Sequence, residues 1–193
     1  MDQPRRLLLA SGSPYRKALL ERLGVPFQAF SPDIDEAPLA GEAPADTALR
    51  LSILKAKAGA PHGDVIIGSD QVASCGGKRY DKPGDHANAV RQLRELSGKT
   101  VEFHTAVTVL ESRSHKLQSR VVPCRVTFRN LDEPRIQAYL EREKPYDCSA
   151  SAKAEGLGIA LIRRIDTDDP TSLIGLPLIA LSEMLERAGL RIL

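Results

Sequence analysis

The chain has 193 residues, and its 27 Lys and Arg against 25 Asp and Glu give a formal net charge of +2. Hydrophobic residues make up 42% and charged residues 27%, which supports a real core and argues against a mainly disordered chain. The small net charge gives no basic stripe for duplex nucleic acid. The 4% aromatic content argues against a stacking platform for single strands.

Membrane and redox signals are also weak. No apolar stretch approaches the ~20 residues of a membrane-spanning helix, and the apolar run after Arg5 and Arg6 is too short for a signal peptide. Cys75, Cys124 and Cys148 are odd in number, far apart and without a CxxC pair, a pattern typical of reduced thiols in the cytosol. We therefore expect a cytoplasmic protein whose partners are neither membranes nor nucleic acid polymers.

The first third of the chain predicts one strand and two helices. Residues 7–10 form an apolar run typical of a buried strand. A helix follows, with Ser13 as N-cap, Pro14 at its first position and Gly24 at its end. After a polar loop over 31–46, helical spacing predicts a helix from about 45 to 58.

The rest of the chain mixes further strands and helices. The pattern predicts strands at 65–67, 100–111, 117–129 and 159–162, a hairpin turn at Gly76–Gly77, and helices at 85–96, 132–142 and 178–188. No internal repeat, low-complexity segment or linker interrupts residues 1–193, which we take as one domain. Because βαβ units alternate with a hairpin, we expect an α/β fold with a mixed sheet.

Several familiar motifs are absent. Gly98-Lys99-Thr100 resembles the end of a P-loop, but the glycine required five residues earlier is Leu93. No GxGxxG follows the first strand, no GxSxG is present, and the four histidines lack metal-binding spacing. Dinucleotide binding, α/β-hydrolase chemistry and a histidine-based metal site therefore have no support.

Two polar segments directly after strands remain as candidate sites. Ser11, Ser13 and Arg16 lie on a strand-to-helix turn, where hydroxyls, a guanidinium and free backbone N–H groups can bind phosphate. The alternative is a Ser13 cap beside a surface arginine. Asp70 follows the strand at 65–67, where α/β folds place ligands, although an aspartate there can also simply form a turn.

Scattered charges complete the candidates: Asp35, Glu36, Lys55, Asp81 and Lys82, each of which taken alone is most simply a solvated side chain. These charges belong to a joint pattern with longer segments of the sequence. The segments are LASGSPYRKALL, DIDE, LSILKA, IIGSDQV, PYDCSASAKAEGLGI and IGLPLIAL. In order and spacing, that pattern resembles the Maf-like nucleotide pyrophosphatases over essentially the whole chain. The resemblance implies a mixed twisted sheet flanked by helices, in two lobes with a central cleft, similar to inosine triphosphate pyrophosphatase.

The resemblance also implies a reaction. Such enzymes hydrolyse nucleoside triphosphates between the α and β phosphates, releasing a monophosphate and pyrophosphate. By carry-over, Asp70 accepts the proton of the attacking water, and Mg²⁺ or Mn²⁺ is bound by Glu36 and Asp70; sequence alone leaves open whether Asp70 is base, ligand or both. The expected phosphate-binding residues are Ser11, Ser13, Arg16, Lys55 and Lys82.

Three positions point to a branch of that family. Tyr15, Gln71 and Glu155 resemble the branch that cleaves 7-methyl-GTP, whereas the dTTP/UTP branch has Arg, Thr and Gln there. A tyrosine face attracts the cationic methylated guanine, and a carboxylate can accept hydrogen bonds from its N1–H and N2–H edge. The implied role is to remove a modified nucleotide from the pool.

Alternatives stay open at this point. Tyr15 could be a packing residue, and Glu155 a surface carboxylate paired with Lys153. The substrate could be dTTP, UTP or a broader set of nucleotides. The chain could also be a nucleotide-binding regulator of septum formation without catalysis. A homodimer is expected from the resemblance alone.

Overall fold

The computed structural model describes residues 5–193 and divides them into two compact units. Unit 1 contains the described part of Met1–Gln71 with Thr105–Val122 and Asp169–Leu193, and unit 2 contains Val72–His104 and Pro123–Asp168. A single domain over residues 1–193, and a cleft between its lobes, stay predictions.

The strands form one seven-stranded sheet in the order β2-β1-β3-β5-β6-β7, with β4 paired to β3. β1 pairs in parallel with β2 and β3, whereas β3–β4 and β6–β7 are antiparallel, so the predicted mixed α/β sheet is confirmed. The strands are β1 (Leu7–Ala10), β2 (Phe27–Phe30), β3 (Val65–Cys75), β4 (Lys78–Arg79), β5 (Thr100–Glu111), β6 (Leu117–Phe128) and β7 (Ile162–Asp166). The α-helices are α1 (Pro14–Glu21), α2 (Pro44–Gly59), α3 (His86–Leu96), α4 (Glu133–Glu143) and α5 (Leu178–Arg187).

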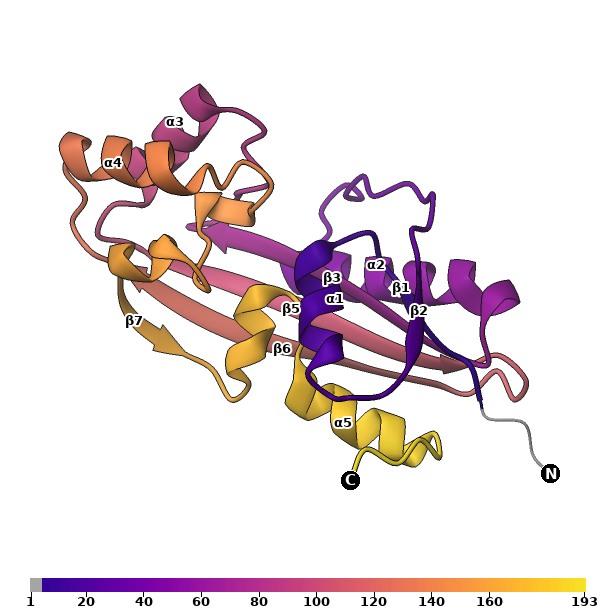
Figure 1. Ribbon diagram of the computed structural model, residues 1–193. Coiled ribbons are helices and arrows are strands. Elements are labelled where there is room, and N and C mark those ends of the chain that lie inside the picture. The colour runs from indigo at the N-terminus through magenta and orange to yellow at the C-terminus, as the bar shows by residue number, and fades with distance from the viewer. Residues whose placement is uncertain (1–4) are drawn as a thin grey trace. The chain divides into compact units, whose positions relative to one another are not determined.

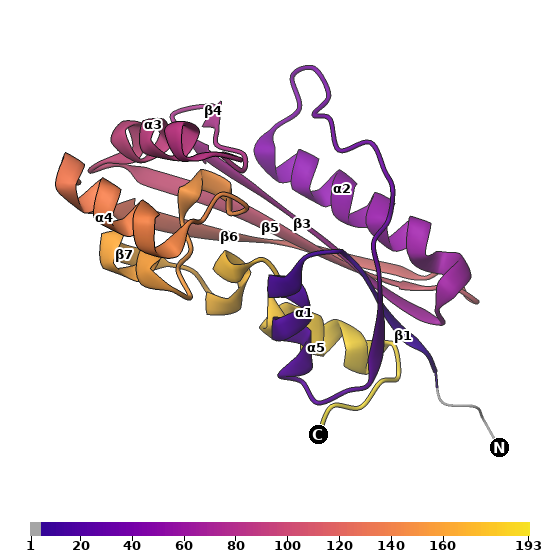
Figure 2. The same cartoon turned by 45° about the horizontal axis from the view of Figure 1, so that its top comes forward.

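In unit 1, helices cover both faces of the strands. Alternate residues of β1 point to opposite faces. Leu7 and Leu9 join a core cluster with side chains of α1 and α5, and Leu8 joins a second cluster with Ala56 of α2. Figures 1 and 2 show α1 and α5 together on one side of β1 and β3, with α2 on the other. Burial on both faces explains why these strands are continuous apolar runs.

The contact between α2 and β3 is unusually close. A Cβ atom built on Gly68 of β3 would lie 2.1 Å from the Ser52 carbonyl oxygen and 2.6 Å from the Ala56 nitrogen, both in the backbone of α2. Only glycine tolerates that approach. The side chain of Lys55, between these two residues of α2, is therefore brought to the surface of the sheet.

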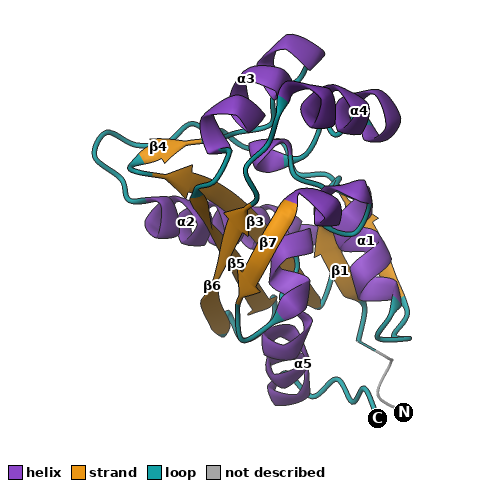
Figure 3. Ribbon diagram, turned by 90° about the vertical axis from the view of Figure 1, so that its left-hand side faces the viewer, coloured by secondary structure: helices purple, strands orange, loops and turns teal. Residues whose placement is uncertain are grey.

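In unit 2, α3 and α4 lie side by side, as Figure 3 shows. Each begins at an aspartate N-cap: Asp85 accepts from the Asn88 N–H at 2.7 Å, and Asp132 from the Arg135 N–H at 3.0 Å. The largest fully buried side chains of this unit are Leu93, Leu96, Phe103, Phe128, Ile136, Leu140 and Leu161. Across residues 5–193, no helix is both long and apolar enough to cross a membrane.

One predicted strand is wrong, and one observed strand was not predicted. The segment 159–162 is not a strand: a 3₁₀ helix spans Leu157–Leu161, and β7 begins only at Ile162. Gly156 and Gly158 donate to the Lys153 carbonyl and turn the chain just before this run, in which Ile159 and Ala160 are exposed and Leu161 and Ile162 are buried. β2 was not predicted at all, because its central residues Gln28 and Ala29 are exposed and it is defined by pairing with β1.

Replacing Gly68 by alanine tests the α2–β3 contact. We expect Gly68→Ala to lower the free energy of unfolding by about 1–3 kcal/mol, because two backbones must separate to admit the methyl group. Gly12→Ala is the control, since its added Cβ meets only the Ser31 side chain. Urea unfolding of both variants measures the difference, and an equal loss in both would contradict the close approach.

Candidate active site

A buried ion pair lies where α2 meets β3. Lys55 Nζ is 2.6 Å from Asp70 Oδ1 and 2.8 Å from Glu36 Oε1. Lys55 and Asp70 are only 6% and 7% exposed, whereas the Glu36 side chain is 57% exposed. Two carboxylates therefore contact one ammonium, and Glu36 faces the solvent. Lys55 and Asp70 form a buried ion pair and are not solvated charges.

The position of Asp70 differs from the expectation in one respect. Asp70 does not follow its strand but lies inside β3, which extends from Val65 to Cys75. The parallel pairing of β1 with β3 ends at the pair Ala10–Gly68, and Asp70 is two residues further on. It therefore still lies beyond the carboxyl end of β1, while its own strand continues through its pairing with other neighbours.

The predicted phosphate turn is assembled at the start of α1. Ser13 caps the helix through the Arg16 N–H, and Arg16 Nη1 donates to Ser11 Oγ at 3.3 Å. Arg16 Nε donates to the Gly175 carbonyl at 2.8 Å, which fixes the guanidinium plane. Burial lowers the pKa of Arg16, and the negative charges of Asp70 and Glu36 oppose that shift. An arginine nevertheless stays cationic at neutral pH, so the turn presents one oriented positive charge.

Two neutral side chains that the sequence does not single out, Ser69 and Thr105, bind backbone carbonyls at and near Gly175, the residue that also binds Arg16. Ser69 Oγ donates to the carbonyls of Ala106 and Gly175 at 2.8 and 3.0 Å, and Thr105 Oγ1 donates to the Ser172 carbonyl at 2.9 Å. Ser69 and Thr105 are fully buried. Their only sequence signal is a hydroxyl within an apolar run, which is too common to single out.

The amide of Gln71, predicted to contact the base, belongs to the same network. Its Nε2 lies 2.9 Å from both Thr105 Oγ1 and the Ser172 carbonyl, and 3.1 Å from the Leu173 carbonyl. The nitrogen end of Gln71 is thus bound within unit 1, which leaves the acceptor Oε1 as the atom suited to a base.

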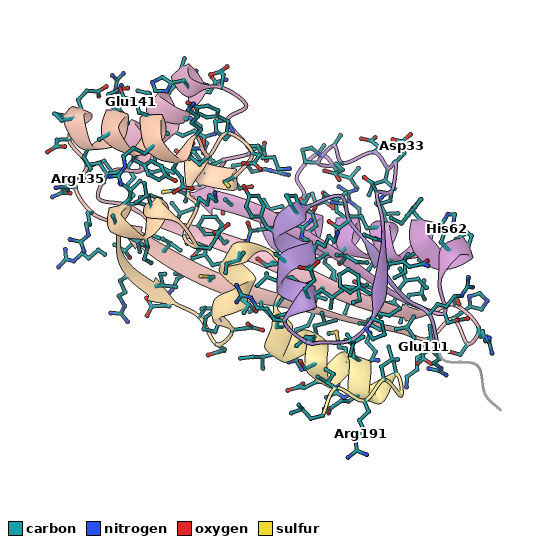
Figure 4. All side chains as sticks on the ribbon, viewed as in Figure 1. Asp33, His62, Glu111, Arg135, Glu141 and Arg191 are labelled. Carbon is teal, nitrogen blue, oxygen red and sulfur yellow. The ribbon has the colours of Figure 1, made fainter. Side chains whose placement is uncertain are left out.

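The loop that carries Glu36 is tied to α2 by an arginine that sequence reasoning also missed. Figure 4 shows Asp33 projecting from this loop. Arg50 of α2 binds Glu42 through Nε at 2.6 Å and Nη2 at 2.8 Å, and donates to the Ala37 carbonyl at 3.0 Å. The hydrogen bond from Arg50 is the main cause that lowers the pKa of Glu42 to about 2. Arg50 therefore holds both ends of the stretch 37–42, which directly follows Glu36.

The remaining predicted residues are distributed over both units. Tyr15 lies half-buried in the first turn of α1 in unit 1. Lys82 and Glu155 are exposed residues of unit 2. The expected alternative partner of Glu155, Lys153, instead binds Glu143 Oε1 at 2.7 Å. Contacts join Lys55 with Glu36 and Asp70, and Arg16 with Ser11 and Ser13. Eight predicted site residues belong to unit 1: Ser11, Ser13, Tyr15, Arg16, Glu36, Lys55, Asp70 and Gln71.

The chain is similar to known proteins over nearly its whole length. A family model described as Maf-like protein matches residues 6–188. The chain belongs to the Maf family. It is 54% identical over 191 residues to a protein of Burkholderia orbicola (strain AU 1054), covering 96% of this chain and 91% of that one. It is 55% identical over 190 residues to a protein of Cupriavidus metallidurans, covering 97% and 96%. Both relatives are named 7-methyl-GTP pyrophosphatase.

A solved structure, that of a HAM1 protein from Coxiella burnetii, has a TM-score of 0.42 and 15% identity to this Maf protein. The match covers 81% of this chain and 98% of that one, and likeness of this degree does not establish a shared fold.

The Maf ion pair can be tested by comparing two substitutions. Lys55→Met leaves the buried Asp70 carboxylate without its ammonium, and we expect a loss of roughly 3 kcal/mol in the free energy of unfolding. Asp70→Asn is nearly isosteric and leaves Lys55 with Glu36, so we expect a smaller loss. Chemical denaturation at neutral pH ranks the two variants, and the reverse order would refute this account of the pair.

Proposed function

We propose that this Maf protein is a nucleoside triphosphate pyrophosphatase that hydrolyses 7-methyl-GTP to 7-methyl-GMP and diphosphate. The observation that carries the proposal is the buried Lys55–Asp70 pair beside the oriented guanidinium of Arg16. The substrate follows from the name of the relatives that are 54–55% identical to the chain over nearly its full length.

The cations of unit 1 suit a polyphosphate. A triphosphate brings about four negative charges, and more charge develops on the departing diphosphate in the transition state. Arg16 and Lys55 supply fixed positive charge, and Ser11 and Ser13 supply hydroxyl donors at the N-terminus of α1. We assign a further phosphate contact to Lys82 of unit 2.

Asp70 is the proposed proton acceptor. A water oxygen bonds to the α-phosphorus, the bond from that phosphorus to the α–β bridging oxygen breaks, and its electron pair leaves with diphosphate. The proton of the water passes to the Asp70 carboxylate. Lys55 holds Oδ1 of that carboxylate at 2.6 Å, which fixes its orientation before the substrate arrives.

The same carboxylates fit a divalent cation. Glu36 and Asp70 each bind Lys55 through one carboxylate oxygen, and carboxylate oxygens are the ligands that Mg²⁺ and Mn²⁺ prefer. Within residues 5–193, no cluster of three or more His, Cys, Asp or Glu side chains could hold a metal. Mg²⁺ commonly takes one or two carboxylates plus substrate phosphates, so this donor set suits it. When bound, such an ion neutralises phosphate charge in the transition state.

Three side chains are proposed to select the base. The Tyr15 ring offers the cationic 7-methylguanine a cation–π contact worth about 0.5–2 kcal/mol. Glu155 would accept hydrogen bonds from the N1–H and N2–H edge, and Gln71 Oε1 would accept from a further donor. We also expect a homodimer in the cytoplasm, as in the family resemblance.

A panel of nucleoside triphosphates with Mg²⁺ or Mn²⁺ tests the reaction. We expect diphosphate release from 7-methyl-GTP in preference to GTP, dTTP and UTP. Asp70→Asn should lower kcat by at least about 10²-fold while nucleotide binding persists, because it removes the proton acceptor and not the cations. Binding without turnover of any nucleotide by the unaltered protein would instead favour the regulator of septum formation.

The selectivity rests on separate residues and has a separate test. In the variant Tyr15→Arg, Gln71→Thr, Glu155→Gln, we expect kcat/KM to shift from 7-methyl-GTP towards dTTP and UTP, because the aromatic face and the guanine acceptor are lost. Steady-state kinetics with the three substrates measure the shift. An unchanged preference would remove these residues from the account of specificity and leave the catalytic pair untouched.

A further inference from the structure

Glu155 stands on a closed turn of the backbone, Lys153–Gly158. The Lys153 carbonyl accepts hydrogen bonds from the Gly156 N–H at 3.1 Å and the Gly158 N–H at 3.0 Å. A Cβ on Gly158 would lie 2.4 Å from that same carbonyl oxygen, so the chain passes too close to itself for any other residue. The turn therefore fixes the backbone on both sides of Glu155.

Tyr139 of α4 joins the entry of this turn to the helix. Its hydroxyl donates to the Ser151 carbonyl at 3.0 Å and accepts from the Lys153 N–H at 3.1 Å. Ala150 and Ser151 just before the turn have φ values of 56° and 54°, a left-handed conformation that is costly for residues other than glycine. A strained segment keeps one conformation only where its surroundings hold it, and the Tyr139 hydroxyl bridges that segment to the turn.

Glu143, one helical turn after Tyr139, holds the turn from both ends. Its Oε1 binds Lys153 Nζ at 2.7 Å, and its Oε2 accepts from the Leu157 N–H at 2.7 Å. A Cβ on Gly156 would come within 2.7 Å of this carboxylate. Arg135 and Glu141 of the same helix are exposed and point outward in Figure 4. One face of α4 therefore carries two polar anchors for one short segment.

We propose that Tyr139 and Glu143 are positioning residues that hold the Glu155 carboxylate in place for the 7-methylguanine base. The inference rests on the proposed function, in which Glu155 accepts from the base. A carboxylate on a turn that is fixed beforehand loses less conformational freedom when it binds, so its hydrogen bonds count more towards affinity. Neither anchor needs to touch the nucleotide.

The protonation states suit this role. The hydrogen bond from Lys153 and then that from the Leu157 N–H lower the pKa of Glu143, which keeps it a carboxylate that accepts at both oxygens. Burial raises the pKa of Tyr139, so its phenol keeps the proton that it donates to Ser151. Both anchors are thus in the required form across the neutral range.

The test removes each anchor and compares it with a matched change nearby. Tyr139→Phe is paired with Tyr80→Phe, which is equally buried but donates its hydroxyl to Glu95. Glu143→Gln is paired with Glu133→Gln on the same helix, where the carboxylate binds Arg94 instead. Two quantities are measured: kcat/KM for 7-methyl-GTP, and the inhibition constant of pyrophosphate, which has no base.

We expect each anchor variant to lower kcat/KM for 7-methyl-GTP about tenfold, the scale of a small misplacement of a binding group. The pyrophosphate inhibition constant should stay the same, as should both quantities in the two controls. In a Glu155→Gln background, neither anchor variant should cause a further loss, because the carboxylate it positions is already gone. General damage to the fold would weaken pyrophosphate binding and add to the Glu155→Gln effect.

The outcomes separate this inference from the proposed function. If the unaltered protein shows no preference for 7-methyl-GTP, the proposed function fails. If it does, and Glu155→Gln abolishes the preference while the anchor variants keep it, only the positioning role is overturned. Should Tyr139→Phe not fold, Lys153→Gln removes the partner of Glu143 from the turn itself, and unchanged kcat/KM there would also overturn the proposal.

Discussion

The close approach of α2 to β3 is the constraint on which the Lys55–Asp70 ion pair of unit 1 depends. Glycine at position 68 lets two backbones lie in contact, and that contact delivers Lys55 to Asp70. A buried charge is costly unless a partner of opposite charge meets it with good geometry. Packing and chemistry are therefore one problem here: any change that moves the helix from the strand leaves two buried charges apart.

The candidate site residues of unit 1 and those of unit 2 lie on different kinds of structure. In unit 1, Asp70, Lys55 and Arg16 stand on a strand, a helix and a capped helix start, which are rigid elements. Glu36 stands on a loop that Arg50 ties to α2. In unit 2, Lys82 and Glu155 stand on exposed loops, and Glu155 keeps a defined position because backbone strain before its turn is countered by anchors on α4. A loop whose side chains can vary between relatives while its backbone stays fixed is a suitable place for residues that select the substrate.

The sequence predicts those elements whose signals are local. The caps at Ser13 and Asp85, the helix over α2 and the long strands β5 and β6 follow from periodicity and capping residues. β2 is not predicted because it is defined by pairing with β1, which no local pattern shows. The run at 159–162 misleads because a short apolar run does not distinguish a strand from a 3₁₀ helix, and Ile159 and Ala160 are exposed. In the site, the charged residues are found by motif. Ser69, Thr105 and Arg50 are missed because their roles consist of hydrogen bonds to backbone carbonyls or to a loop distant in sequence.

One of those carbonyls connects the Arg16 side chain with the strand that carries Asp70. The Gly175 oxygen accepts from Arg16 Nε at 2.8 Å and from Ser69 Oγ at 3.0 Å, which uses both of its lone pairs. Ser69 directly precedes Asp70 on β3, so one carbonyl oxygen connects the Arg16 guanidinium with the part of the strand that carries Asp70. Gln71, on the other side of Asp70, holds the Ser172 and Leu173 carbonyls just before that atom. The residues on both sides of Asp70 therefore bind the turn that holds the Arg16 guanidinium, and they do so with neutral side chains, which a search for charged motifs does not find.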